Sequence, residues 1–94
     1  MQEPRELFVD LRTTITEARG LMDNYRETRT NYLTRLRDEG KLVMSGPFNE
    51  GGGGLIIFKA SSPKEARELS SNDPFVLHGI QKTNLKAWSV RLYQ

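Results

Sequence analysis

The sequence contains no cysteine and only one histidine, and these two shortages exclude several kinds of chemistry. Without cysteine the chain has no disulfide framework, no thiol nucleophile and no thiolate metal ligand, and one histidine cannot form a histidine-based zinc centre. We therefore expect no metal and no cofactor. Long apolar runs are also missing: nothing approaches the roughly 18 apolar residues that span a bilayer, and the polar start lacks the apolar core of a signal peptide. These features predict a cytoplasmic protein with no membrane partner.

A large excess of charge of one sign is missing as well. Fourteen lysine and arginine residues stand against twelve acidic ones, giving a formal net charge of +2, and the two signs alternate along the chain. Because nucleic-acid binding needs a continuous basic face, no nucleic-acid partner is expected. A chain of 94 residues is expected to form one domain, residues 1–94. A domain of this size tends to bury further surface against a partner, which predicts a homodimer.

The spacing of apolar residues predicts alternating strands and helices. We expect strands at residues 6–15, 41–48, 53–60 and 84–93, and helices at residues 16–39 and 63–71. This order is that of the ferredoxin-like βαββαβ fold, an α+β architecture in which two helices cover one face of an antiparallel sheet. The other face is then left for a second subunit.

Two strands show which side chains share a face. In the first strand, alternation places Leu7, Val9 and Leu11 on one face. Phe8, Asp10 and Arg12 then lie on the other face. The last strand is apolar on both faces. Trp88, Val90 and Leu92 lie on one face, and Leu85, Ala87 and Tyr93 lie on the other. Both faces of the last strand are therefore expected to be covered, one by helices and one by the partner.

Local signals support the second helix and the hairpin. The segment SSPKEARELSS has Ser62 as a helix N-cap, Pro63 at the first helical position and Glu65 to complete a capping box. The glycine run is not a phosphate loop, because Gly52 and Gly53 stand where such a loop needs Lys and Ser or Thr. The run also leads into a strand rather than a helix. It is interpreted as a flexible hairpin connection.

Arg29 is the most informative charged residue of the first predicted helix. At 100° per residue it falls inside the apolar stripe formed by Tyr25, Tyr32, Leu33 and Leu36. A guanidinium cannot lose its charge, so in such a place it needs a carboxylate, a bound anion or water. Alternatively, its stem packs on the sheet while its head reaches solvent. The spacing leaves both interpretations open.

The segment NDPFVLHG contains an aspartate before a proline and the single histidine. Asp73 is kept out of helical geometry by Pro74, which suits the first position of a new turn, so Asp73 is expected to cap that turn. A cap leaves a second carboxylate oxygen available for a ligand or an arginine. His78 lies at the end of the turn, where the helix dipole favours the protonated ring. Capping alone is a sufficient explanation of Asp73, and a structural or exposed role is the usual one for a lone histidine.

Two stretches carry a resemblance to a known family. The segments YLTRLRDEGKLVMSGP (residues 32–47) and GGLIIFKASSPKEARELSSNDPFVLHGI (residues 53–80), followed by a closing strand, resemble the YciI-like (YCII-related) proteins. The likeness runs from about residue 7 to residue 92. It implies a dimeric α+β barrel built from two ferredoxin-like protomers, with a small-molecule pocket in each.

The resemblance also implies a set of site residues. The family typically has a histidine on the first helix and an aspartate in the Asp-Pro turn, regarded as a catalytic pair. Asp73 takes the place of the aspartate, whereas Arg29 falls at the place of the histidine. Because arginine is no general base at neutral pH, we expect Arg29 to bind an anionic substrate or orient Asp73, leaving proton transfer to Asp73 or His78. The implied substrate-binding residues are Arg26, Tyr32, Ser45, Gly46, Pro47 and Phe75.

Two functions are compatible with these residues. The first is a small-molecule enzyme of the lyase or isomerase type, catalysing a dehydrohalogenation, dehydration or double-bond shift on an aromatic-breakdown intermediate, since relatives of this fold act on such molecules. The alternative is a non-catalytic protein that binds a small anionic or phenolic ligand. Arg29 in place of the histidine favours this alternative.

Overall fold

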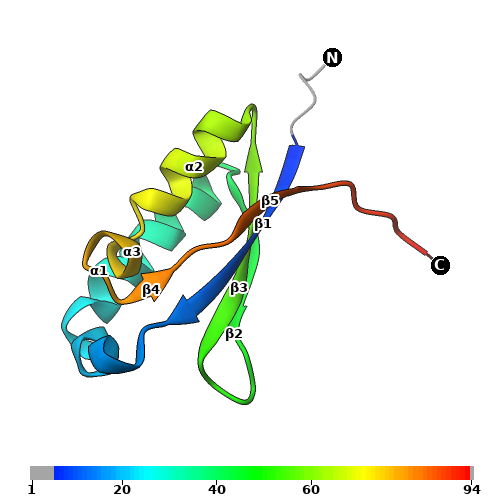
Figure 1. Cartoon of the computed structure of the whole chain (residues 1–94). Helices are drawn as coiled ribbons and strands as arrows, with labels where there is room; N and C mark the ends of the chain where they lie inside the picture. The colour runs from blue at the N-terminus through cyan, green and yellow to red at the C-terminus, as the bar shows by residue number, and fades with distance from the viewer. Residues whose placement is uncertain (1–5, 94) are drawn as a thin grey trace.

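The computed structural model describes residues 6–93, which form one antiparallel sheet covered on one face by helices (Figure 1). The elements follow one another in this order: β1 (Glu6–Thr14), the 3₁₀ helix η1 (Thr16–Leu21), α1 (Met22–Asp38), β2 (Leu42–Pro47), β3 (Gly53–Ala60), α2 (Pro63–Ser71), α3 (Pro74–Leu77), β4 (Gln81–Lys82) and β5 (Leu85–Trp88). This is the predicted α+β, ferredoxin-like arrangement, with the short α3 and the two-part last strand as additions.

The sheet has the strand order β2-β3-β1-β4, and β5 also pairs with β1. All of these pairings are antiparallel. The central strand β1 therefore pairs with β3 along one edge and with β4 and then β5 along the other. Residues in the middle of β1 are surrounded by backbone on both sides, which makes this strand the scaffold of the buried polar groups described below.

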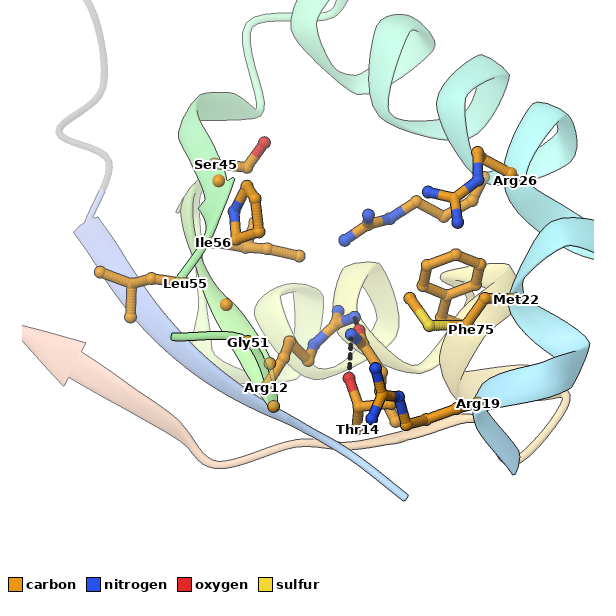
Figure 2. A pocket seen from close by; sticks show the side chains of 17 residues that line it. Arg12, Thr14, Arg19, Met22, Arg26, Ser45, Gly51, Leu55, Ile56 and Phe75 are labelled. Atoms are coloured by element: carbon orange, nitrogen blue, oxygen red, sulfur yellow. Dashed lines mark hydrogen bonds between the residues drawn. The ribbon is translucent and has the colours of Figure 1, made fainter. Parts of the chain in front are cut away.

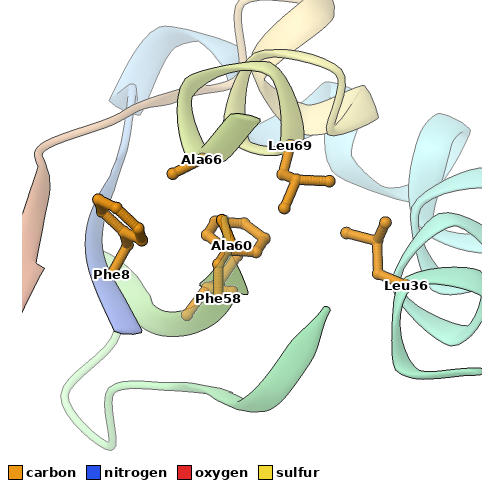
Figure 3. Packing of buried hydrophobic residues seen from close by; sticks show 7 residues of the cluster. Phe8, Leu36, Phe58, Ala60, Ala66 and Leu69 are labelled. Carbon is orange, nitrogen blue, oxygen red and sulfur yellow. The ribbon is translucent and has the colours of Figure 1, made fainter. Parts of the chain in front are cut away.

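The core lies between the sheet and its helices. Phe8, Phe58 and Ala60 project from β1 and β3 toward Ala66 and Leu69 of α2 and Leu36 of α1 (Figure 3). All six are buried, and Phe58, Ala60 and Ala66 have no exposed surface. Burial of apolar surface at roughly 25 cal/mol per Å² is the main favourable contribution to folding.

The predicted last strand is longer than the observed one. Only Gln81–Lys82 and Leu85–Trp88 are strands, and residues 89–93 run away from the sheet on the side opposite the helices (Figure 1). The reason is the register, because Trp88 pairs with Leu7 and β1 begins at Glu6. The prediction that Val90, Leu92 and Tyr93 belong to this strand was therefore wrong.

The predicted helix over residues 16–39 is also divided in the structure. Residues 16–21 form η1, and the α-helix begins only at Met22. Gly20 lies in this first segment, where its low helix propensity and the common occurrence of 3₁₀ turns at helix starts explain the tighter winding. Gly40 has a φ of 75° and follows the end of α1, as the predicted glycine stop requires.

The start of α2 is close to the predicted one. The Ser62 side chain accepts a hydrogen bond from the Glu65 backbone N–H at 3.1 Å. The Glu65 carboxylate accepts in return from the backbone N–H of Ser61, at 2.8 Å, rather than from that of Ser62. This hydrogen bond from Ser61 lowers the pKa of Glu65. The reciprocal pairing of the capping box is thus present but shifted by one residue.

Candidate functional site

A buried polar network lies where β1 passes beneath α2 and α3. Arg12 is 1% exposed and Asp10 has no exposed surface. The Arg12 guanidinium donates to Asp10 Oδ2 through Nε at 2.8 Å and to Asp73 Oδ2 through Nη1, also at 2.8 Å. It donates further to the Gln81 side chain at 3.3 Å and to the Ser70 carbonyl at 3.5 Å. One guanidinium therefore ties four elements of the fold together.

Asp10 is also satisfied by groups other than Arg12. Its Oδ2 accepts a hydrogen bond from the Ser70 hydroxyl at 2.6 Å, and its Oδ1 accepts one from the Asn84 backbone N–H at 3.2 Å. Among the residues that the structure describes, no buried side-chain nitrogen or oxygen lacks a hydrogen-bond partner. A network of this kind is costly to disturb, because each group that loses its partner stays buried.

Asp73 is both a cap and a charge partner. Its Oδ1 accepts from the Phe75 backbone N–H at 2.9 Å, which caps α3. Its Oδ2 accepts from Arg12 at 2.8 Å and from Nε of Arg29 at 3.4 Å. Asp73 has no exposed surface. The capping role expected from the Asp-Pro pair and the arginine contact expected from the family resemblance thus coexist on one carboxylate.

Arg29 lies between this network and solvent. Its side chain is 23% exposed, and its guanidinium carbon lies 4.7 Å from the centroid of the Phe75 ring, as in a cation–π contact. Burial lowers the pKa of Arg29, and the positive charges of Arg12 and Arg26 act in the same direction, whereas Asp73 opposes them. Asp73 and Phe75 hold Arg29, and among residues 6–93 its hydrogen bond to protein is made through Nε, which leaves its two NH₂ groups available to a ligand.

Arg29 opens onto a pocket of about 420 Å³ between the helices and the β2–β3 hairpin. Arg19, Met22 and Arg26 lie on the helical wall, and Ser45, Ile56 and Gly51 lie on the opposite wall (Figure 2). Arg12, Thr14 and Gln81 also line it. The pocket therefore combines several guanidinium groups with apolar side chains and a wall of glycine backbone.

The glycine wall has conformations that other residues rarely adopt. Gly51 and Gly52 have φ values of 83° and 81°, and Gly53 has a φ of 151°. A Cβ at Gly53 would also collide with the carbonyl of Arg12. These glycines let the hairpin turn tightly against β1, so that backbone rather than side chains closes this side of the pocket.

Most of the residues that the resemblance implied are close to this pocket. Arg26, Arg29, Ser45, Gly46, Pro47 and Phe75 all line it. Asp73 does not line it, but contacts Arg12 and Arg29, which do. Among residues 6–93, no carboxylate or imidazole lines the pocket.

Tyr32 and His78 lie elsewhere. The Tyr32 hydroxyl donates to the Leu69 carbonyl at 2.7 Å, and burial raises the pKa of Tyr32 to about 12. His78 is exposed and its ring stacks on that of Tyr25, with 3.8 Å between the centroids. Neither residue lines the pocket. The structure therefore does not bring these two side chains to the site where the resemblance placed them.

The buried network and the pocket also contain residues that the sequence analysis did not single out. Asp10 and Arg12 had been placed on the same face as Phe8, and that face is the one that the helices cover. Opposite charges two residues apart on a covered strand face were a usable signal of a buried ion pair. Arg19 was also missed, although residues 19, 22, 26 and 29 have the spacing of one helix face.

The fold and the pocket together define a small ferredoxin-like α+β protein with an arginine-lined cavity. Residues 8–89 match the model of the YCII-related domain. The chain is also similar to YjpA, an uncharacterized protein of Bacillus subtilis (strain 168), with 37% identity over 60 residues. The matched segment covers 64% of this chain and 71% of YjpA. The chain therefore belongs to the YCII-related family, which confirms the resemblance described above.

Two solved structures share the fold. The 5-chloro-2-hydroxyhydroquinone dehydrochlorinase TftG from Burkholderia phenoliruptrix AC1100, in complex with 2,5-dihydroxybenzoquinone, has a TM-score of 0.75 at 22% identity. That likeness covers 88% of this chain and 93% of the other. SnoaB, a cofactor-independent oxygenase from Streptomyces nogalater, has a TM-score of 0.53 at 11% identity, covering 96% and 97% of the two chains. At these identities the comparison supports the fold.

Two features are absent from residues 6–93. No helix in this range combines the length and the apolar character needed to cross a bilayer. Within the same residues, no three side chains of His, Cys, Asp or Glu come together in a way that could hold a metal ion.

Proposed function

We propose that the pocket binds a small anionic molecule and that the protein is an enzyme of the lyase or isomerase type acting on it. The observation that carries this proposal is the position of Arg29. Its Nε is held by a buried carboxylate, its face lies on Phe75, and its NH₂ groups adjoin a cavity of substrate size. A guanidinium fixed in this way is suited to a carboxylate, phenolate or enolate oxygen.

The proposed chemistry is stabilisation of negative charge. Dehydrohalogenation, dehydration and double-bond shifts pass through enolate-like or phenolate-like states. The two eliminations release a proton together with halide or water, a double-bond shift removes one proton and returns one at another carbon, and none of them needs a redox partner. Arg29 would stabilise the developing negative charge, and preorganised donors of this kind often supply the largest part of a rate enhancement. Asp73 would act as a positioning residue for Arg29. The fold is shared with a dehydrochlorinase, which supports this reaction class.

A second candidate function, non-catalytic binding of an anionic or phenolic ligand, is favoured by one observation. Asp73, the only carboxylate that contacts Arg29 among residues 6–93, accepts three hydrogen bonds and does not line the pocket. Direct general-base action by Asp73 therefore needs a rearrangement of the two arginines. In the absence of such a rearrangement, binding without turnover is the expected behaviour.

The two functions are separated by measuring turnover and binding on the same compounds. Chlorinated hydroquinones and other phenolic intermediates of aromatic breakdown are incubated with the protein, and chloride release and product spectra are followed. Thermal shift reports binding in parallel. Turnover that disappears in Arg29→Gln supports the enzyme. A stabilising shift without turnover supports the binding protein, and neither signal with any anionic compound contradicts both.

Arg29→His tests the role of the fixed charge through pH. Benzoate is the probe, because its own charge is constant from about pH 6 to pH 9. An imidazole has an ordinary pKa of about 6.5, which Asp73 raises by favouring the charged form and burial lowers. Binding to Arg29→His is therefore strongest at low pH and falls as the pH rises through the imidazole pKa.

The wild-type protein provides the reference for this pH profile. Because arginine remains charged throughout the range, benzoate affinity in the wild type is expected to change little. The two affinities are measured by calorimetry at constant ionic strength. A flat profile in Arg29→His would mean that position 29 does not contact the anion.

We also propose that the protein is a homodimer in which two sheets pack face to face. The face of the sheet away from the helices carries Leu7, Val9, Leu11, Leu55, Ile57 and Trp88. Trp88 is 42% exposed and Leu11 is 39% exposed. Lys59 and Lys86, the cross-strand partners of Leu7 and Val9, lie on the same face. Exposed apolar side chains grouped in this way typically mark an interface.

Trp88→Glu tests the dimer. A buried charge without a partner disfavours the interface, so the variant is expected to shift to the monomer mass in light scattering at micromolar concentration. Leu77→Glu is the matched control, because Leu77 is 61% exposed and lies on α3, on the helical side of the sheet. A wild-type monomer, or equal dissociation by both variants, would contradict the proposed interface.

A further inference from the structure

The helical wall of the pocket is long enough to contact more than one anionic group of a ligand. Arg19, Met22, Arg26 and Arg29 follow one another at spacings of three, four and three residues, which places them along one side of η1 and α1. All four line the pocket. Ten residues of helix span about 15 Å, several times the width of a carboxylate. The wall therefore offers separate places for negative charge.

The arginines around the pocket differ in how closely carboxylates of the protein neutralise them. In the buried network, Asp10 and Asp73 pair with Arg12 and Arg29. Of the carboxylates in residues 6–93, Asp23 alone pairs with Arg26, at 2.9 Å, and the two side chains are 87% and 61% exposed. Such an exposed pair contributes little and is easily exchanged for another anion.

Arg19 is the least balanced cation of this wall. Among the residues that the structure describes, no carboxylate lies within salt-bridge distance of Arg19. Its side chain nevertheless lines the pocket, together with the Thr14 and Gln81 side chains. Within residues 6–93, Arg19 is thus a cation at the cavity with no carboxylate in ion-pair contact.

The two available cations lie at different places. In Figure 2, Arg26 and Arg19 extend from the helical wall at separate points, and Met22 and Phe75 lie between them. Arg29 lies over Phe75 and is close enough to Arg26 for their charges to interact. The pocket thus has an Arg26–Arg29 end, an Arg19 end and an apolar surface between the two.

We infer that the pocket selects an organic dianion, a molecule with two separate anionic groups joined by an apolar ring or short chain. One group binds Arg26 and Arg29, the other binds Arg19, and the apolar middle packs on the partly exposed Met22. Phe75 is only 2% exposed and lies against Arg29, so it supports the wall rather than offering a large contact surface. This inference rests on the proposed anion-binding function and names its substrate class. A cavity of about 420 Å³ has room for a substituted ring.

Calorimetry with size-matched probes tests the second anionic group. The probes are the three benzenedicarboxylates and the monomethyl ester of each, at constant ionic strength. At least one diacid is expected to bind at least tenfold more tightly than its own ester. In Arg19→Gln this advantage disappears, whereas the affinity for the ester stays within twofold of the wild-type value. In Arg29→Gln both affinities fall at least tenfold.

Arg37→Gln is the matched control, because Arg37 is on the same helix, carries the same charge and does not line the pocket. It is expected to leave both affinities within twofold. Equal weakening by Arg37→Gln and Arg19→Gln would assign the effect to net charge and overturn the inference. Inorganic phosphate that binds as tightly as the best diacid would overturn the two-ended arrangement.

The remaining outcomes separate this inference from the proposed function. If diacids and esters bind equally and Arg29→Gln weakens both, the dianion class is overturned while the anion pocket stands. If none of the probes binds, the proposed function and the dianion class fail together.

Discussion

Arg12→Gln is expected to be among the most destabilising single substitutions in this protein. The Arg12 guanidinium is 1% exposed and contacts both Asp10 and Asp73, neither of which has exposed surface. Removing one partner of a buried ion pair typically costs about 3–5 kcal/mol, because the remaining charge stays buried without compensation. Arg29 can still pair with Asp73, so the loss falls mainly on Asp10.

Urea denaturation followed by circular dichroism measures this effect. Arg37→Gln is the control, since Arg37 pairs with Asp38 at the surface, where such pairs contribute little. The double variant Asp10→Asn/Arg12→Gln is expected to be less destabilised than the sum of the two single variants, because each single change leaves the other group unpaired. Additive losses, or an Arg12→Gln variant as stable as the control, would contradict a coupled buried network.

Much of the fold follows from local patterns. The alternation in β1 correctly separated Phe8, Asp10 and Arg12 from the residues of the opposite face. The capping residues of α2 and the Asp-Pro cap of α3 were also recognisable, because each depends on neighbours within a few positions. Periodicity and capping are properties of short segments, so a single sequence is sufficient to reveal them.

The site depends on contacts between distant segments, which local patterns do not specify. Arg12 and Asp73 are 61 positions apart in the chain, and nothing in either segment names the other. Arg29 was singled out because a charge inside an apolar stripe needs a partner, but the stripe did not identify Asp73. The family resemblance supplied that pairing. The end of the last strand was similarly beyond local reasoning, since its length depends on where β1 begins.

Asp73 offers a second large effect, because its two roles can be measured separately. Asparagine caps helices about as well as aspartate, so Asp73→Asn retains an acceptor for the Phe75 N–H while removing the charge that faces Arg12 and Arg29. We expect Asp73→Asn to lower the free energy of unfolding by about 3 kcal/mol, the scale for breaking a buried ion pair. Asp73→Ala should lose about 1 kcal/mol more, the usual contribution of an N-cap.

Ser62→Ala provides an internal reference for the capping contribution. Ser62 caps α2 through its side chain and takes part in no salt bridge, so its loss of about 1 kcal/mol should match the difference between Asp73→Asn and Asp73→Ala. If Asp73→Asn is as stable as the wild type while Asp73→Ala resembles Ser62→Ala, the carboxylate charge contributes nothing net to the fold. Asp73 would then be a cap alone, and Arg29 would have to be held at the pocket by Phe75 without help from the aspartate.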